Sequence, residues 1–343
     1  MILGERVRLL KTGWDDALVY ERDAPAPAAP TGTNVVVAVE ACGVCHRDLL
    51  DRSGRFPFLQ LPITPGHEAV GRVVAVGEGV TDWRVGDRVA TMHRDSCGEC
   101  APCREGQTSL CQGGAWAFGI LADGGYARAL VAPQSALFRM PNAIAAPEAA
   151  VLHCTLGTAY RDLATLGGVK KGDRVLVTGA NGGVGAAAVQ IAMRLGADVV
   201  GVVRSEKHVA FVRGLGAKDV VVDATGAFHN AVGKVDVALD TVGVATFASA
   251  LRCLRVGGRI VVVGNIAPEK VALNLGYVIT FGLTIVGGSG ANRNEMATVA
   301  VMHEEHPFVG LVDRTLPLSR AEEAQQLVRA GGLHGRVVLV TEP

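Results

Sequence analysis

The sequence predicts an α/β protein that combines a β-rich unit with a doubly wound parallel sheet, and two patterns along the chain lead to this prediction. Up to about residue 140, short Val-rich segments alternate with Gly-rich turns, which indicates strands joined by tight turns. From about Pro147 onward, strand-length apolar runs alternate with helical segments, as is typical of a parallel sheet with helices on its faces. The length of 343 residues favours two domains.

The elements can be placed in chain order from their apolar runs. A Pro/Ala-rich link at residues 24–33 precedes the first expected strand, Val35–Val39, and residues 146–166 are expected to be helical. The later expected strands are 174–177, 199–203, 220–222, 235–239, 260–263 and 283–286, with a helix over 184–195. A helix near 320–330 and a strand at 337–340 follow. We therefore expect one domain made of residues 1–153 and 288–343, with a parallel-sheet domain, residues 154–287, inserted into it.

Composition argues against several classes of protein. Lys+Arg and Asp+Glu both number 33, so the formal net charge is zero and nothing suggests a nucleic-acid partner. The apolar runs are of strand length, so we expect no membrane span, and charges among the first residues argue against a signal peptide. Four of the eight cysteines lie in one cluster, which favours metal binding in a reducing cytoplasm over disulfides.

The cysteine cluster has the spacing of a metal site. Cys97, Cys100, Cys103 and Cys111 follow the pattern C-x2-C-x2-C-x7-C. Zinc binds four thiolates in a tetrahedron, and closely spaced cysteines on one loop can reach one ion. Four protein ligands leave no open position, so this zinc would be structural. The alternatives are a coincidental cysteine-rich loop and an iron–sulfur site.

A glycine-rich turn joins the strand at 174–177 to the helix that follows. The turn reads GANGGVG, and its candidate cofactor-binding residues are Gly179, Gly182, Gly183, Val184 and Gly185. Glycines let the backbone approach a pyrophosphate closely, and the helix N-terminus supplies amide donors. The order of strand, turn and helix predicts a dinucleotide-binding Rossmann domain, against the alternative of a purely structural turn.

The end of the next strand indicates the choice of cofactor. NAD sites usually have Asp or Glu at this point to accept from the ribose hydroxyls. This chain has Val203, followed by Arg204, Ser205, Glu206 and Lys207. Arg204 and Lys207 would neutralise a 2′-phosphate and Ser205 would hydrogen-bond to it, so NADP(H) is favoured over NAD(H). Glu206 counts against this interpretation, and a solvated helix start is the alternative.

Several segments together resemble the zinc-containing medium-chain dehydrogenases. They are ACGVCHRDLL, PITPGHEAVGRVVAVGEGV, the four-cysteine loop, VLVTGANGGVG, LDTVG and GGRIVVVG, and they extend over nearly the whole chain. The resemblance implies a catalytic zinc held by Cys45, His67 and Cys154, with Glu68 near the metal and Asp48 orienting His67. Two thiolates and one imidazole leave the open position that catalytic zinc requires. Taken alone, each cysteine or histidine would more simply be a core residue.

The same resemblance implies cofactor contacts and a mechanism. Thr158 would pack beside the nicotinamide, Arg336 would lie near the pyrophosphate, and Gly264 would border the cofactor. His46 would contact the cofactor phosphates or pass a proton. Zinc would act as a Lewis acid on the oxygen of a small-molecule substrate while hydride passes between substrate carbon and nicotinamide. Such proteins are usually dimers or tetramers, so we expect a homodimer or homotetramer.

One departure from this resemblance bears on function. Alcohol dehydrogenases of this type usually have Ser or Thr where this chain has Arg47, and arginine cannot relay a proton. From Thr178 onward the sequence is also similar to archaeal NADPH-dependent acryloyl-CoA reductases, which share the Arg47-Asp48 pair and reduce an activated C=C bond. The intact ligand set favours a zinc-dependent oxidoreductase acting between NADP(H) and an alcohol or carbonyl. An NADPH-dependent 2-enoyl reductase is the second hypothesis, and a protein that kept the fold but lost the chemistry is the third.

Overall fold

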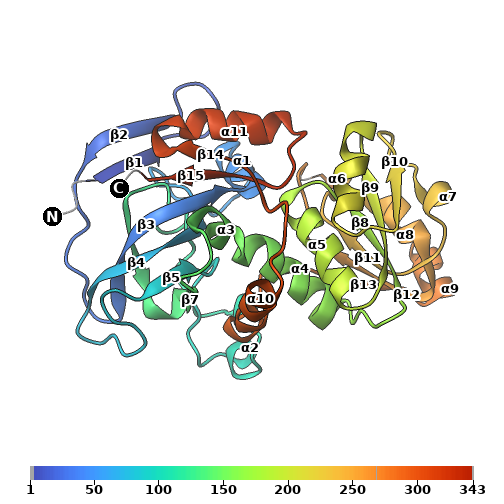
Figure 1. Ribbon diagram of the computed structural model, residues 1–343, viewed down its shortest axis with the longest axis horizontal. Coiled ribbons are helices and arrows are strands. Elements are labelled where there is room, and N and C mark those ends of the chain that lie inside the picture. The colour runs from blue at the N-terminus through green and yellow to red at the C-terminus, as the bar shows by residue number, and fades with distance from the viewer. Residues whose placement is uncertain (1–3, 268, 342–343) are drawn as a thin grey trace.

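The two kinds of sheet that the sequence predicts form two lobes that lie side by side (Figure 1). The computed structural model describes residues 4–267 and 269–341. A largely antiparallel sheet forms the first lobe and a fully parallel sheet forms the second. Helix α10 (Arg293–Glu305) lies near the boundary between the lobes, so the boundary is covered by segments distant in sequence (Figure 1).

The first lobe unites early and late segments of the chain. Its strand order is β14 (Val312–Pro317), β15 (Arg336–Val340), β3 (Asn34–Val44), β4 (Glu68–Val76), β5 (Arg88–Thr91) and β7 (Leu137–Arg139), with β6 (Ala129–Pro133) paired to β3. A separate hairpin consists of β1 (Gly4–Leu9) and β2 (Leu18–Ala24). The helices of this lobe are α1 (His46–Arg52), α2 (Ala101–Arg104) and α11 (Ala321–Ala330). Because β15 pairs with β3, the late segment completes the sheet that carries the early motifs.

The second lobe has the strand order of a dinucleotide-binding sheet. The order is β10 (Asp219–Val222), β9 (Asp198–Val203), β8 (Arg174–Thr178), β11 (Val235–Asp240), β12 (Leu254–Val262) and β13 (Thr284–Gly287). Its helices are α5 (Gly183–Arg194), α6 (Val209–Gly214), α7 (His229–Val232), α8 (Phe247–Cys253) and α9 (Leu275–Phe281). From β8 the chain builds the sheet outward first through β9 and β10, and then on the other side through β11, β12 and β13. In such sheets, ligands bind at the carboxyl ends of the strands beside this change of direction, which here lies between β8 and β11.

The α/β fold class is confirmed, and the differences in detail have physical causes. Strand β3 continues to Val44, because the charge that interrupts its apolar run, Glu40, pairs with Arg88 at 2.9 Å. Strand β12 begins at Leu254, earlier than expected. The sequence did not indicate its first half, because that half is largely exposed and has no apolar run. Strand β14 was not predicted, since its sequence VDRTLP has no strand-length apolar run.

The expected helix over 146–166 forms, but with two irregular turns. It consists of α3 (Ala146–Val151), a π-helical turn (His153–Gly157), α4 (Thr158–Tyr160) and a second π-helical turn (Arg161–Leu166). Helix α3 packs on β3 and β4, whereas the first π-helical turn and α4 pack on α5 of the other lobe. The stretch therefore joins both lobes, and the expected division between residues 153 and 154 stays a prediction, as does the one between 287 and 288.

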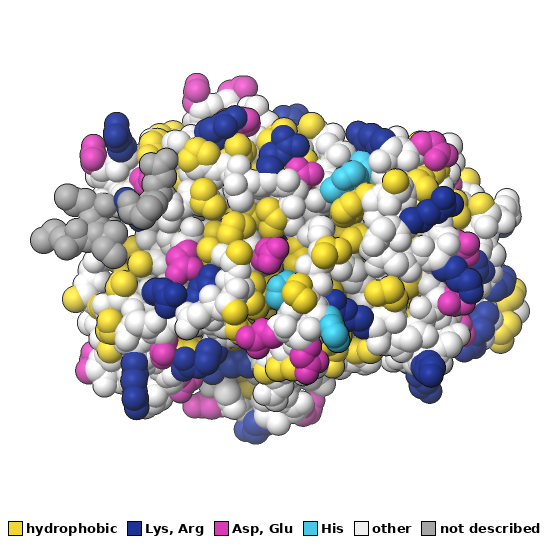
Figure 2. All heavy atoms as spheres, viewed as in Figure 1, with side chains coloured by type: hydrophobic (Ala, Val, Ile, Leu, Met, Phe, Trp, Pro, Cys, Tyr) yellow, Lys and Arg dark blue, Asp and Glu magenta, His cyan; other side chains and the backbone are white. Residues whose placement is uncertain are grey.

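The surface agrees with the balanced composition. On the face drawn in Figure 2, Lys and Arg side chains are interspersed with Asp and Glu side chains, and neither sign gathers into one large patch. In the ranges 4–267 and 269–341, no helix combines the length and the apolar character that crossing a membrane requires.

Candidate metal centres and cofactor site

Four side chains from three segments meet in a buried cluster, which we call the catalytic cluster. Cys45 precedes α1, His67 and Glu68 lie at the start of β4, and Cys154 lies on the first π-helical turn. Their ligand atoms all lie within 4.8 Å of one another. Cys154 Sγ is 3.9 Å from Cys45 Sγ and 3.6 Å from His67 Nε2. The structure therefore brings together the four residues that the family resemblance implied.

Asp48 holds the imidazole of His67 in the orientation that a metal ligand needs. Its Oδ1 lies 3.2 Å from His67 Nδ1, while its Oδ2 accepts hydrogen bonds from the Tyr126 hydroxyl at 2.9 Å and the Cys45 backbone N–H at 3.0 Å. A proton on Nδ1 leaves the Nε2 lone pair facing the thiols. Burial and Arg47 lower the pKa of His67, but the Asp48 carboxylate outweighs them and raises it to about 9. The sequence did not reveal Tyr126, which has no motif of its own.

One guanidinium contacts three of the four side chains of the catalytic cluster. The guanidinium Nη2 of Arg336 lies 3.4 Å from Cys45 Sγ, 3.5 Å from Cys154 Sγ and 3.2 Å from Glu68 Oε1. A hydrogen bond from Cys154 and the charge of Arg336 lower the pKa of the Cys45 thiol well below its usual value, although burial acts in the opposite direction. Burial raises the pKa of Glu68 to about 7, with Arg336 opposing. The hydrogen bond with Cys45 and burial raise the pKa of the Cys154 thiol well above its usual value, so a bound cation would be needed to hold both sulfurs as thiolates.

The donor set fits zinc. Glu68 is buried, and while its Oε1 pairs with Arg336, its Oε2 has neither a hydrogen bond nor an ion pair with another described residue. An acceptor without a donor in a buried site is costly unless a ligand satisfies it. Two thiols and one imidazole with a neighbouring carboxylate match a catalytic zinc site with one open position.

Arg336 also borders the glycine turn. A Cβ added at Gly183 would lie 2.8 Å from the Arg336 guanidinium carbon, and Gly335 forms a bridge with Gly182. Arg336 thus lies between the catalytic cluster and the turn expected to hold a pyrophosphate. The sequence predicted its proximity to the cofactor but not its contacts with the thiols.

The second cysteine group, which we call the cysteine loop, lies between β5 and β6. The four sulfurs of this group lie within 4.8 Å of one another. Backbone N–H groups of Cys97 and Gly114 each lie 3.2 Å from Cys111 Sγ, which they stabilise as an acceptor. Backbone hydrogen bonds from Gln112 and Cys103 lower the pKa of Cys100 to about 6. Four converging sulfurs with such donors suit a closed tetrahedral zinc site.

Arg47 is committed to structural contacts. Its Nη2 donates to the Phe118 carbonyl at 2.6 Å, and its Nε lies 3.3 Å from Asp51 Oδ2. Burial raises the pKa of Asp51 to about 7, while Arg47 opposes this shift. Arg47, at the position where the family resemblance implied a Ser or Thr hydroxyl, therefore carries a guanidinium held by these two contacts.

The glycine turn has the close packing that its sequence predicts. Gly179 has φ +58°, and a Cβ at Gly185 would lie 2.1 Å from the Gly179 carbonyl oxygen. Gly182 precedes α5, whose 12 residues direct backbone N–H groups toward the turn. After β12, a Cβ at Gly264 would lie 1.8 Å from the Thr241 carbonyl oxygen, so only glycine allows the chain to pass there.

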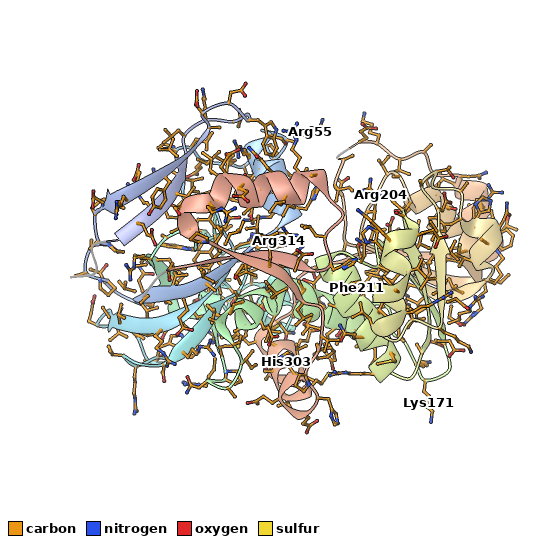
Figure 3. The ribbon with its side chains drawn as sticks, turned by 45° about the horizontal axis from the view of Figure 1, so that its top comes forward. Arg55, Lys171, Arg204, Phe211, His303 and Arg314 are labelled. Carbon is orange, nitrogen blue, oxygen red and sulfur yellow. The ribbon has the colours of Figure 1, made fainter. Side chains whose placement is uncertain are left out.

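The segment after β9 carries basic side chains without ion-pair partners. Val203 is buried, Ser205 is half-buried, and Arg204 and Lys207 are exposed. No ion pair or hydrogen bond joins either basic side chain to another described residue. The loop before β15 approaches them, since a Cβ at Gly331 would lie 3.3 Å from Arg204 Nη2. Figure 3 shows Arg204 and Phe211 on the side of the second lobe that faces this loop.

A pair of histidines links the same loop to the second lobe. His334 Nε2 lies 2.9 Å from His208 Nδ1, and the His334 ring stacks on Phe211 with centroids 4.1 Å apart. Burial lowers the pKa of His208, and the neighbouring His334 adds to this shift. The sequence did not predict this contact, because His334 and α6 are far apart along the chain.

Two further predicted residues lie close to the catalytic cluster. Thr158 is buried at the start of α4, with its hydroxyl 3.5 Å from the His153 carbonyl oxygen. His46 is half-buried at the first position of α1, and burial lowers its pKa, with the Cys45 thiolate opposing. Their roles beside the nicotinamide and the phosphates stay predictions.

A cavity of about 330 Å³ lies next to two histidines that adjoin the catalytic cluster, and none of the four residues of the cluster lines it. His93, Arg94 and His153 line it, together with residues of the cysteine loop and the start of α10. The His93 ring centroid lies 5.1 Å from that of His67 and 4.3 Å from that of His153. Burial lowers the pKa of His93 well below its usual value and that of His153 to about 4. Sequence reasoning missed these residues, although His93 and Arg94 follow β5 directly.

Comparisons with known proteins agree with the geometry. Residues 31–142 match the family model of the alcohol dehydrogenase GroES-like domain, and residues 183–304 match that of the zinc-binding dehydrogenases. An alcohol dehydrogenase of Geobacillus stearothermophilus is 35% identical over 89% of this chain and 91% of its own length. The chain therefore belongs to the zinc-containing medium-chain alcohol dehydrogenase family and is an oxidoreductase.

One similar protein carries a different activity in its name, and one solved structure superposes closely on this chain. The acryloyl-coenzyme A reductase of Sulfurisphaera tokodaii is 32% identical over 93% of this chain and 96% of its own length. The crystal structure of AibC superposes with a TM-score of 0.92 at 38% identity, covering 99% of this chain and 96% of the other. The family thus includes near relatives named for alcohol oxidation and for reduction of an unsaturated thioester.

Proposed function

We propose that this protein transfers a hydride between NADP(H) and an alcohol or carbonyl substrate, with a catalytic zinc at Cys45, His67 and Cys154 and a structural zinc in the cysteine loop. The observation that carries the proposal is the catalytic cluster itself, whose ligand atoms lie within 4.8 Å of one another beside a cavity. A zinc ion at this cluster would supply Lewis acidity toward the substrate oxygen.

The residues around the cluster support this role. Asp48 fixes the tautomer of His67, so that Nε2 faces the open side of the cluster. Burial of all four side chains excludes water, which strengthens electrostatic interactions with a substrate. In this proposal Thr158 limits where the nicotinamide ring lies, and the closeness of Arg336 to Gly183 supports a contact between its guanidinium and the cofactor pyrophosphate.

Arg204, Ser205 and Lys207 favour NADP(H) in this proposal. A 2′-phosphate would gain charge-assisted hydrogen bonds from basic groups that otherwise have no partner among the described residues. Replacing Arg204 by alanine should raise the KM for NADPH by about 10–100-fold and leave the KM for NADH nearly unchanged. The exposed Arg213 on α6 provides a charge-matched control. Equal NADPH and NADH constants in the parent protein would contradict this preference.

A second function, reduction of a 2-enoyl substrate by NADPH, is favoured by the contacts of Arg47. Its guanidinium is held by the Phe118 carbonyl and Asp51 and offers no proton relay. Hydride addition to an activated C=C bond needs no alkoxide to lose its proton. The similarity to an acryloyl-coenzyme A reductase agrees with this alternative.

One assay separates the two functions. Zinc-replete protein is given NADPH with a panel of aldehydes and ketones and, in parallel, with acryloyl- and crotonyl-CoA, and cofactor oxidation is recorded. Turnover confined to the aldehydes and ketones supports the first function, and turnover confined to the thioesters supports the second. A Cys45→Ala variant that kept full activity would refute the zinc mechanism. We also propose that the protein assembles as a homodimer or homotetramer, which sedimentation would test.

A further inference from the structure

The cavity beside the catalytic cluster is positioned to hold the part of a substrate that does not react. Two imidazoles, those of His93 and His153, form its wall next to the metal ligands. His93 lies against His67, and His153 directly precedes Cys154. A small molecule whose reacting carbon lies at the cluster would therefore extend over these rings toward the cysteine loop. The volume of about 330 Å³ suits a short substrate.

The cavity wall contains polar atoms that nothing in the protein satisfies. In the part of the chain that the structure describes, His93 Nε2, His153 Nδ1 and Arg94 Nε are buried and have no hydrogen-bond partner. A buried donor or acceptor without a partner costs about 1–3 kcal/mol, and more when the group is charged. The wall therefore includes side chains with polar groups that the protein leaves unpaired, and of these three side chains only Arg94 carries a permanent charge.

The charge of the wall is positive and uncompensated. Among the described residues, none of those lining the cavity is Asp or Glu. Asp95, the neighbour of Arg94 in sequence, turns its Oδ1 to the Trp116 backbone N–H at 3.0 Å. The other arginine of the wall, Arg293, is satisfied, because its Nε donates to the Leu137 carbonyl at 2.8 Å and its Nη1 pairs with a carboxylate. Among the described residues that line the cavity, Arg94 is therefore the cation without an ion-pair partner.

We propose that the substrate carries a carboxylate at the end remote from its reacting carbon, and that Arg94 binds this carboxylate. The proposal rests on the proposed function, and it names the class of substrate as short oxo acids with their hydroxy-acid counterparts. Ser96, Thr108 and Ser135 also line the cavity, and their hydroxyls would offer further hydrogen bonds to a polar ligand. Guanidinium–carboxylate pairs of this kind are strong because both partners are charged.

A matched pair of aldehydes tests the proposal in the zinc-replete enzyme. With NADPH, kcat/KM is measured for succinic semialdehyde and for butanal, which differ mainly in the terminal carboxylate. We expect the parent to prefer the acid by about tenfold or more, and Arg94→Gln to lower kcat/KM for the acid by about 10–100-fold more than for butanal. Arg94→Lys should restore part of the preference. Arg84→Gln, an exposed control that does not line the cavity, should leave the ratio as in the parent.

A binding measurement separates this inference from the proposed function. Calorimetric titration with succinate, which cannot accept a hydride, should show binding that weakens about tenfold or more in Arg94→Gln and that falls with added salt. Succinate binding without turnover of any aldehyde would support the carboxylate site and refute carbonyl chemistry. Equal turnover of both aldehydes in the parent, with no binding of succinate, would overturn the carboxylate site and leave the carbonyl chemistry standing. An unchanged acid-to-aldehyde ratio in Arg94→Gln would also overturn it.

Discussion

Replacing Asp48 by asparagine tests whether the carboxylate beside His67 sustains metal binding at the catalytic cluster. Asp48 accepts hydrogen bonds on both oxygens, from His67 Nδ1 on one side and from Tyr126 and the Cys45 backbone on the other. An amide cannot accept on both sides. If its NH2 faces the Cys45 N–H, two donors meet. If its NH2 faces His67, the imidazole must carry its proton on Nε2, where the metal would bind.

Either orientation should weaken zinc at this cluster alone. Loss of a carboxylate that orients a histidine ligand typically lowers metal affinity by about 10–100-fold, which corresponds to about 1.4–2.7 kcal/mol. Because the cysteine loop does not contact Asp48, its zinc should stay bound. We expect a colorimetric chelator to remove one zinc from Asp48→Asn at a concentration that leaves the parent intact, and dehydrogenase or reductase activity to disappear with that ion.

Asp51→Asn is the matched control, because Asp51 is also a buried carboxylate on α1 but forms its ion pair with Arg47 rather than with a ligand. It should lose zinc no faster than the parent. The reasoning would be refuted if Asp48→Asn kept both zinc ions against the chelator as tightly as the parent does.

Cys103→Ser should lower the zinc content by one ion per chain and reduce the melting temperature, because three ligands no longer close the tetrahedron. Elemental analysis and thermal unfolding measure both effects. Gly185→Ala should destabilise the fold and abolish dinucleotide binding in calorimetry, because its Cβ would overlap the Gly179 carbonyl oxygen at 2.1 Å. Asp162→Asn should remove a pH dependence of stability. Burial raises the pKa of Asp162 to about 7, so its stabilising proton is fully held below about pH 4 and is lost as the pH rises toward 7.

Each of these variants has an outcome that would count against it. Full thermal stability of zinc-depleted Cys103→Ser would show that the loop needs no metal. Gly182→Ala is the control for Gly185→Ala, because a Cβ there has 3.4 Å to the same carbonyl oxygen, and equal melting temperatures in the two variants would contradict the steric argument. Asp162→Asn should be more stable than the parent at pH 8, and this advantage in the free energy of unfolding should be smaller at pH 5. This advantage of the variant should grow by at most about 3 kcal/mol between pH 5 and pH 8, and an identical pH profile would exclude the effect.

Features encoded by neighbouring residues could be predicted from the amino-acid sequence. The spacing of the cysteine loop brings four sulfurs to one point with only local turns, and the GANGGVG turn follows from a strand, glycines without Cβ atoms and a helix in direct succession. The strands of the parallel sheet are buried on both faces, so they read as unbroken apolar runs. The family resemblance then supplied Cys45, His67 and Cys154, which no local spacing connects.

Contacts between distant segments were decided by the tertiary structure. Arg336 reaches the thiol of Cys45 across 291 positions in the chain because β15 pairs with β3, and Tyr126 reaches Asp48 across 78 positions. Arg94 is an ordinary charged residue in sequence, and its place on a cavity wall where no described residue is Asp or Glu is known only from the structure. The spacing of residues along the chain determines which side chains meet within one turn or strand. The environment of a charged side chain depends instead on which elements pack around it, and the strand order of the whole sheet determines that packing.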